Sequence, residues 1–205
     1  MNKHSGFTLI EISIVLGIIG LILGAVMLSS TDVIGKTKTT GTLSLIKDLS
    51  AAITDFKGRY HYLPGDLPKA ANDIPNLATG SKCDISPNLT IGNGQIDTAD
   101  EKDCVAVELL QAGLIKGNIS GIMSPYNRGQ TPDVFVLTTN QSAGVETLVV
   151  PTFAATVQNA IEIRNIPCDA ATAIDNKIDD GNATTGNVIS SACGASGLTT
   201  LDVAL

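Results

Sequence analysis

Histidine and aromatic residues are scarce in this sequence of 205 residues, and tryptophan is missing altogether. The two histidines both precede residue 62, so histidine-based metal sites and catalytic triads are not expected. Basic residues are also few, with 13 Lys and Arg against 20 Asp and Glu, for a formal net charge of −7. A nucleic-acid-binding protein needs a basic surface to replace phosphate counterions, so no nucleic-acid partner is expected.

The sequence lacks the patterns that carry catalysis as well. No nucleophile lies beside a suitable base, and no glycine-rich loop has the P-loop spacing. The adjacent carboxylates Asp179 and Asp180 are more typical of a turn than of an acid–base pair. A hydrophobic content of 43% is too high for a disordered chain. We therefore expect a folded protein that is not an enzyme.

A long apolar run follows a short polar start. Residues 1–6 are polar, and the 23 residues from Phe7 to Ser29 are mostly apolar. As a helix the run would measure about 34 Å, enough to cross a bilayer core of about 30 Å. A secretory signal peptide is the competing interpretation, but its apolar region is usually only about 7–15 residues long. We therefore expect one transmembrane helix over residues 7–30.

The acidic residue Glu11 lies inside this run. A carboxylate deep in a transmembrane helix costs about 2.5–3.5 kcal/mol on insertion scales, so it needs a partner or a function. One interpretation is that Glu11, near the start of the run, reaches the headgroup layer. Its setting favours another, because Gly6 to Glu11 (GFTLIE) resembles the processing site of type IV prepilins and type II secretion pseudopilins.

This resemblance implies cleavage after Gly6 by a prepilin peptidase and methylation of the new N-terminal Phe7. It implies that Glu11 holds the place of the assembly residue, through which the chain joins other pilin or pseudopilin subunits. The implied location is the bacterial inner membrane, with the N-terminus cytoplasmic and the globular domain periplasmic. An inner-membrane assembly platform would then transfer the chain to a pseudopilus or surface pilus. Major pilins usually carry proline at the place of Leu28, which favours a minor pilin or pseudopilin.

Helical spacing of apolar residues continues from Leu45 to Tyr60 and predicts an amphipathic continuation of the helix over 31–60. The turn-forming residues that follow, Leu63 to Gly65, mark its end. Residues 61–205 are expected to form a globular domain. Within it we expect helices over 104–115, 153–165 and 170–179, and strands over 134–139, 145–150, 188–192 and 198–203. The predicted class is α+β, a pilin-like fold with the long helix packed on a small antiparallel sheet with extra short helices.

The four cysteines predict disulfides, because their number is even and the domain is expected beyond the membrane. Four cysteines allow three pairings. Sequential pairing closes two loops of similar length, with 20 and 24 intervening residues. Zinc is disfavoured, since there is no CxxC pair and no nearby histidine. The expected pairs are Cys83–Cys104 and Cys168–Cys193.

Two acidic loops carry side chains that suit calcium, the only cofactor that the sequence suggests. The first resembles half of an EF-hand loop, in which oxygen-bearing side chains alternate with other residues. Its candidate ligands are Asn93, Asp97, Asp100 and Asp103. The second lies at the expected C-terminal end of a helix, where negative charge is unfavourable unless something offsets it. Its candidate ligands are Asp175, Asp179 and Asp180. For both loops the alternative is a solvated turn whose side chains bond its own backbone.

The expected function is that of a structural subunit of a type II secretion pseudopilus or a type IV pilus. The alternative is a membrane-anchored calcium- or ligand-binding subunit, such as an adhesin at a fibre tip. Loss of secretion on gene deletion would indicate the pseudopilus, whereas loss of fibres or adhesion would indicate a pilus or tip role. A DNA-uptake pilin is disfavoured because it requires a basic patch on the globular domain.

Overall fold

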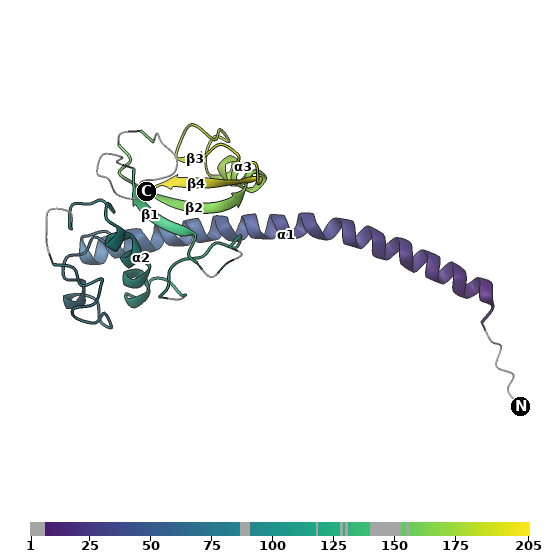
Figure 1. The fold of residues 1–205 in the computed structure, drawn as a ribbon, viewed down its shortest axis with the longest axis horizontal. Helices are drawn as coiled ribbons and strands as arrows, with labels where there is room; N and C mark the ends of the chain where they lie inside the picture. The colour runs from purple at the N-terminus through teal and green to yellow at the C-terminus, as the bar shows by residue number, and fades with distance from the viewer. Residues whose placement is uncertain are drawn as a thin grey trace, which may run out of the picture. The chain divides into compact units, whose positions relative to one another are not determined.

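The computed structural model describes residues 7–86, 91–117, 119–127, 129, 131–139, 153–154 and 156–205, and for residues 26–32 it describes the backbone alone. The chain divides into two compact units, Met1–Lys38 and Thr39–Leu205. The helices are α1 (Leu9–Tyr60), the short 3-10 helix η1 (Ala70–Asn72), α2 (Ala99–Gln111) and α3 (Cys168–Ile178). The strands are β1 (Val134–Thr138), β2 (Asn159–Pro167), β3 (Val188–Ser190) and β4 (Leu198–Ala204) (Figure 1).

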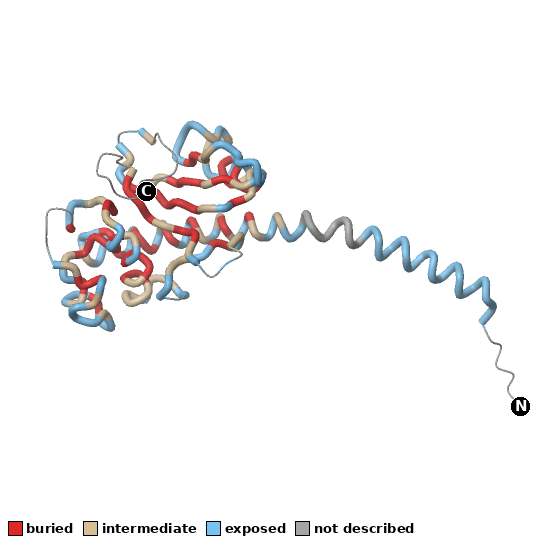
Figure 2. The backbone as a smooth tube through the Cα atoms, viewed as in Figure 1, coloured by how far each residue is buried: buried red, intermediate tan, exposed pale blue. Residues whose placement is uncertain are grey.

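Helix α1 runs without a break for 52 residues, and its C-terminal part belongs to the globular unit. Ile46, Leu49, Ile53 and Phe56 are buried at steps of three and four residues, which places them on one face of the helix. Figure 2 shows buried and exposed positions alternating along this part of the helix. The helix ends where His61 adopts a left-handed conformation with φ of 65°.

The four described strands form one antiparallel sheet in the order β1-β2-β4-β3. Side chains alternate between its two faces. Ile161 and Ile163 of β2 share one hydrophobic core with Leu201 and Val203 of β4 and with the buried stripe of α1. That core also includes residues of α2 and α3. The fold is therefore α+β, consistent with the predicted pilin-like fold.

The helix predicted over 153–165 is wrong, because residues from Asn159 onwards form β2. The five residues 159–163 are all buried, although Glu162 is charged. Burial on both faces hides the alternation between apolar and polar residues that usually identifies a strand. The strand predicted over 145–150 lies outside the described residues, and the strand predicted over 134–139 is β1, which ends one residue earlier, at Thr138.

The other predicted elements agree with the structure to within a few residues. The helix predicted over 104–115 begins earlier, at Ala99, because Thr98 caps it in a capping box with Glu101. Helix α3 and strands β3 and β4 match the elements predicted over 170–179, 188–192 and 198–203.

Both disulfides have the predicted pairing. Cys83–Cys104 ties the segment before α2 to that helix, and Cys168–Cys193 ties the start of α3 to the segment after β3. No free cysteine remains. In the chain-entropy model, each such loop closure stabilises a fold by about 3 kcal/mol.

Candidate functional site

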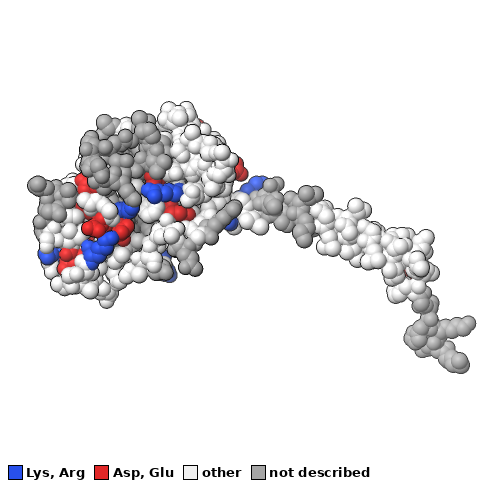
Figure 3. All heavy atoms as spheres, viewed as in Figure 1, with Lys and Arg blue, Asp and Glu red and all other residues white. Residues whose placement is uncertain are grey.

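The N-terminal part of α1 presents apolar side chains to its surroundings. The side chains described between Phe7 and residue 25 are all exposed in the single chain, with Phe7 at 81% and Leu9 at 88%. Figure 3 shows that this part of the helix is almost free of charged residues on the visible face. A large contiguous apolar surface marks a site that contacts another protein or a membrane.

Within the described part of the chain, no helix combines the length and the apolar character that a membrane span requires. The span predicted over 7–30 continues into residues 26–30, whose side chains lie outside the described set.

Glu11 caps the first turn of α1. Its Oε2 accepts hydrogen bonds from the backbone N–H of Thr8 at 3.3 Å and from the Thr8 hydroxyl at 3.2 Å. In return, the Glu11 backbone N–H donates to Thr8 Oγ1 at 3.3 Å. Thr8 directly precedes the helix, so these contacts form a capping box. The T-x-x-E pattern from Thr8 to Glu11 could have revealed this role, which the sequence prediction did not include.

The first acidic loop folds around Asp66, a residue that the sequence prediction did not include. Asp66 is buried, and its Oδ2 accepts a hydrogen bond from the Gly94 N–H at 2.7 Å. Its Oδ1 accepts from the N–H groups of Asn93 and Gly92. Backbone amides of the loop thus bind a carboxylate of the chain itself. Burial raises the pKa of Asp66, although the three amide hydrogen bonds oppose that shift.

The four candidate ligands of this loop bind protein groups. Asn93 Nδ2 donates to Asp97 Oδ2 at 3.0 Å. On the surface, Lys82 Nζ lies 3.2 Å from Asp100 Oδ1 and 2.7 Å from Asp103 Oδ2. Among the described residues, Asp97, Asp100 and Asp103 do not form a group of converging carboxylates.

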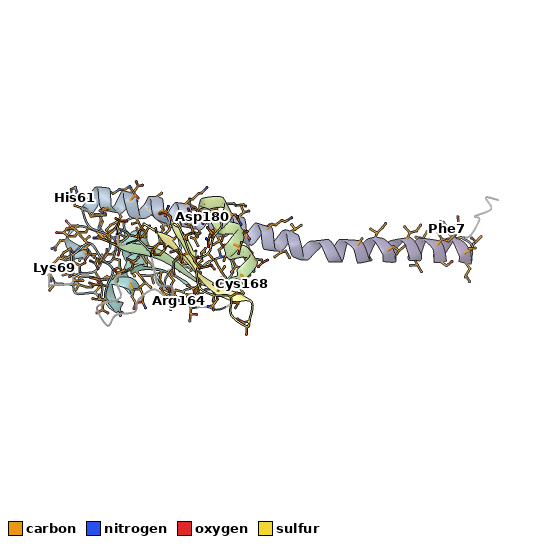
Figure 4. All side chains as sticks on the ribbon, turned by 90° about the horizontal axis from the view of Figure 1, so that it is seen from above. Phe7, His61, Lys69, Arg164, Cys168 and Asp180 are labelled. Carbon is orange, nitrogen blue, oxygen red and sulfur yellow. A yellow bond between two sulfur atoms is a disulfide. The ribbon has the colours of Figure 1, made fainter. Side chains whose placement is uncertain are left out.

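The second acidic loop does bring its three candidate ligands together. One carboxylate oxygen from each of Asp175, Asp179 and Asp180 lies within 4.8 Å of the others. Each residue also accepts a hydrogen bond from the loop backbone, as Asp175 Oδ1 does from Gly181 N–H at 3.2 Å. The arrangement therefore suits both a cation and a self-bonded turn. Figure 4 labels Asp180 near the end of α3.

Two buried carboxyls of α2 bind backbone amides, Glu108 in the turn after α1 and Glu101 at the start of α2 itself. Glu108 Oε2 accepts a hydrogen bond from the Gly65 N–H at 2.7 Å, and Glu101 Oε2 accepts from Thr98 N–H at 2.8 Å. Gly65 has a φ of 91°, and a Cβ there would collide with the Glu101 carbonyl oxygen. Burial raises the pKa of Glu108 to about 8 and that of Glu101 to about 7, and the charge of Asp66 adds to both shifts.

Residues 1–27 match the family model of the prokaryotic N-terminal methylation motif. This match supports a type IV prepilin-like or pseudopilin family for the chain. The motif implies processing by prepilin peptidase and assembly with other pilin subunits, and proteins with this motif are structural rather than enzymatic. No curated protein matches the chain significantly.

Replacing Glu108 by Gln is expected to weaken the pH dependence of stability. Because the folded-state pKa of Glu108 is raised, its contribution is fully present below the unfolded value and is lost as the pH rises through about 8. Glutamine keeps an acceptor for Gly65 N–H but cannot ionise. The free energy of unfolding of the full chain in detergent should fall less steeply with rising pH in Glu108→Gln than in the wild type. The two slopes should differ by at most about 1.4 kcal/mol per pH unit. The exposed Asp73→Asn is the control, and equal slopes for Glu108→Gln and wild type would contradict the assignment.

Calcium binding at Asp175, Asp179 and Asp180 predicts a higher melting temperature in calcium than in chelator. A ligand that binds only the folded state stabilises it by about 2.7 kcal/mol at a hundredfold excess over Kd. Asp180→Asn should reduce the difference, whereas Asp100→Asn should leave it unchanged. Identical melting of the wild type in calcium and in chelator would exclude calcium at both loops. Loss of the effect in Asp100→Asn alone would place the ion at the first loop.

Proposed function

We propose that this chain is a structural subunit of a type II secretion pseudopilus or a type IV pilus, assembled through its N-terminal helix. The observation that carries the proposal is the uncovered apolar surface of α1, which begins within the matched motif and carries Glu11 in its first turn. Burial of apolar surface against neighbouring helices stabilises association by about 25 cal/mol per Å². Helices of several copies that pack together would cover this surface.

Before assembly, the same segment would hold the chain in the bacterial inner membrane. The support is the length of the apolar run in the sequence, Phe7 to Ser29. The N-terminus would then be cytoplasmic and the globular domain periplasmic. The two disulfides support that side for the domain, because disulfides persist in oxidising compartments.

A minor pilin or pseudopilin is the more specific proposal. No proline occurs between Leu9 and Tyr60, and Leu28 stands where major pilins usually carry one. Proline removes a backbone hydrogen bond and breaks or kinks a helix, so its absence suits a helix that stays intact. The continuous backbone of α1 is in keeping with this proposal.

Glu11 would act as a docking group between subunits. Cleavage after Gly6 turns the α-amine of Phe7 into a cation, four residues before Glu11. Within a chain, Glu11 already caps the helix through Thr8. In a filament, the amine of a neighbouring subunit could lie against Glu11 in a medium of low dielectric constant, where electrostatic attraction is strong. Removing one partner of a buried pair costs about 3–5 kcal/mol, so the pair would favour a single register of assembly.

A calcium- or ligand-binding subunit at a fibre tip is the second candidate function. The convergence of Asp175, Asp179 and Asp180 favours it. This candidate differs from the first in its dependence on the second loop. Asp180→Asn would remove adhesion and leave fibre formation intact under the second candidate, and would leave both intact under the first.

Substitutions of Glu11 separate its capping role from its charge. Glu11→Gln keeps an acceptor for the capping box, since glutamine also serves at this position, but it removes the charge. We predict that Glu11→Gln, Glu11→Ala and Glu11→Lys are all expressed and processed but fail to enter fibres or to support secretion, Glu11→Lys most completely. The measurement is the amount of chain in sheared fibres or of secreted substrate, at matched expression.

The control is Ser13→Ala, an exposed position on the same helix whose hydroxyl bonds only the Ile10 carbonyl oxygen. It should assemble like the wild type. Normal assembly of Glu11→Gln together with failure of Glu11→Ala would show that Glu11 acts only as a helix cap.

A further inference from the structure

Two acidic residues face each other across the centre of the sheet. Glu162 of β2 and Asp202 of β4 are direct partners in the antiparallel register. Their sequence neighbours Ile161 and Leu201 point into the core beneath the sheet, so Glu162 and Asp202 point to the opposite face. Side chains in such pairs have Cβ atoms about 4.5–5.5 Å apart. Both residues have an exposed fraction of 0%.

The two carboxyls differ in their partners. Arg164 Nε donates to Glu162 Oε1, and its guanidinium carbon lies 4.6 Å from the centre of the Phe135 ring. Figure 4 shows Arg164 on the side of the sheet away from α1. In contrast, neither carboxylate oxygen of Asp202 has a hydrogen-bond partner within the described part of the chain. An ionised, fully buried carboxylate without a partner is strongly unfavourable.

The charged groups near this pair in the described part of the chain come from few elements. On β2 they are Glu162 itself and Arg164, and β3 contributes no titratable side chain. Helix α3 packs on the other face, where Ile174 joins the core with Leu201. Lys102 of α2 lies 5.3 Å from the Phe135 ring, and its charge interacts with that of Glu162. Among the described residues, Arg164 is thus the cation that acts on both carboxyls. Like charges in directly opposite positions destabilise a strand pair.

We propose that Glu162 and Asp202 form a proton-binding pair, in which Asp202 carries a proton in the native domain while Arg164 binds Glu162. With that proton bound, the three side chains are neutral together. Burial raises the pKa of Asp202 to about 8, with a further rise from the charge of Glu162 and an opposing effect of Arg164. Asp202 is the member of the pair whose carboxylate oxygens have no hydrogen-bond partner among the described residues, so the proton is placed there.

The pair makes the stability of the pairing between β2 and β4 depend on pH. The folded-state pKa of Asp202 is raised, so its contribution is fully present below the unfolded value near 4 and is lost as the pH rises through about 8. Above that pH, Asp202 is charged directly opposite Glu162, between the two inner strands of the four-stranded sheet, which lie side by side in Figure 1. The inference rests on the geometry of the sheet and is independent of the proposed function.

The direct test is a titration of aspartate side-chain carboxyls by ¹³C NMR on the full chain in detergent. The resonance missing from Asp202→Asn identifies Asp202. We expect it to shift with a midpoint near pH 8 in the wild type. In Glu162→Gln the midpoint should fall by at least one pH unit, because the charge of Glu162 no longer raises the pKa of Asp202 while Arg164 still lowers it. An Asp202 midpoint below about pH 5 in the wild type would overturn the proposal.

Hydrogen exchange supplies a readout that needs no assignment of Asp202. After correction for the intrinsic rate, the amides of β4 in the wild type should lose protection by up to tenfold per pH unit between about pH 4 and pH 8, and the loss should level off above that range. Asp202→Asn, which cannot ionise at this position, should lose less protection than the wild type over the same range, the remaining loss coming from groups such as Glu108. Glu108→Gln is the matched control, since it removes a different buried carboxyl and should retain the loss in β4. Equal losses in the wild type and Asp202→Asn would contradict the pair.

Discussion

The globular unit depends on the packing of one stripe of α1 against one face of the sheet. Ile46, Leu49, Ile53 and Phe56 belong to a single core with residues from β1, β2, β3 and β4. Helices α2 and α3 add apolar residues to the same core. A four-stranded sheet with so short an edge strand as β3 needs such a helical cover to be stable. One helix, α1, therefore has two roles. Its C-terminal part packs in the core, and its N-terminal part presents the exposed apolar surface.

Outside this core, buried carboxylates organise the irregular segments. Asp66 collects the amides of the loop from Gly92 to Gly94, and Glu108 holds the turn at Gly65. Asp133 likewise accepts hydrogen bonds from the backbone N–H of Ser124 at 2.7 Å and from the Ser124 hydroxyl at 2.7 Å. These acidic side chains replace regular secondary structure as partners for backbone amides. Their burial raises the pKa of Asp66 and of Glu108, so part of the domain's stability depends on bound protons.

Elements with a local signal could be predicted from the sequence. The long helix, α3 and the short strands followed from periodicity, and the disulfides from loop lengths. Strand β2 was missed because residues such as Glu162 are buried together with their apolar neighbours, which removes the polar face. Asp66 was missed because its partners are 26–28 residues away and are backbone amides, which leave no side-chain pattern. The capping role of Glu11 had a local pattern, T-x-x-E, that the motif resemblance overshadowed.

The central claim is that the N-terminal segment is a processed assembly element and not merely an apolar helix. Cleavage at this site would require the peptidase to accept a residue without a side chain, Gly6, three residues before the helix that starts at Leu9. Intact-mass measurement of the chain extracted from membranes of cells with active prepilin peptidase tests this most directly. The account predicts a polypeptide that begins with N-methylated Phe7 and retains both disulfides. A chain that still begins at Met1 in those cells would contradict it.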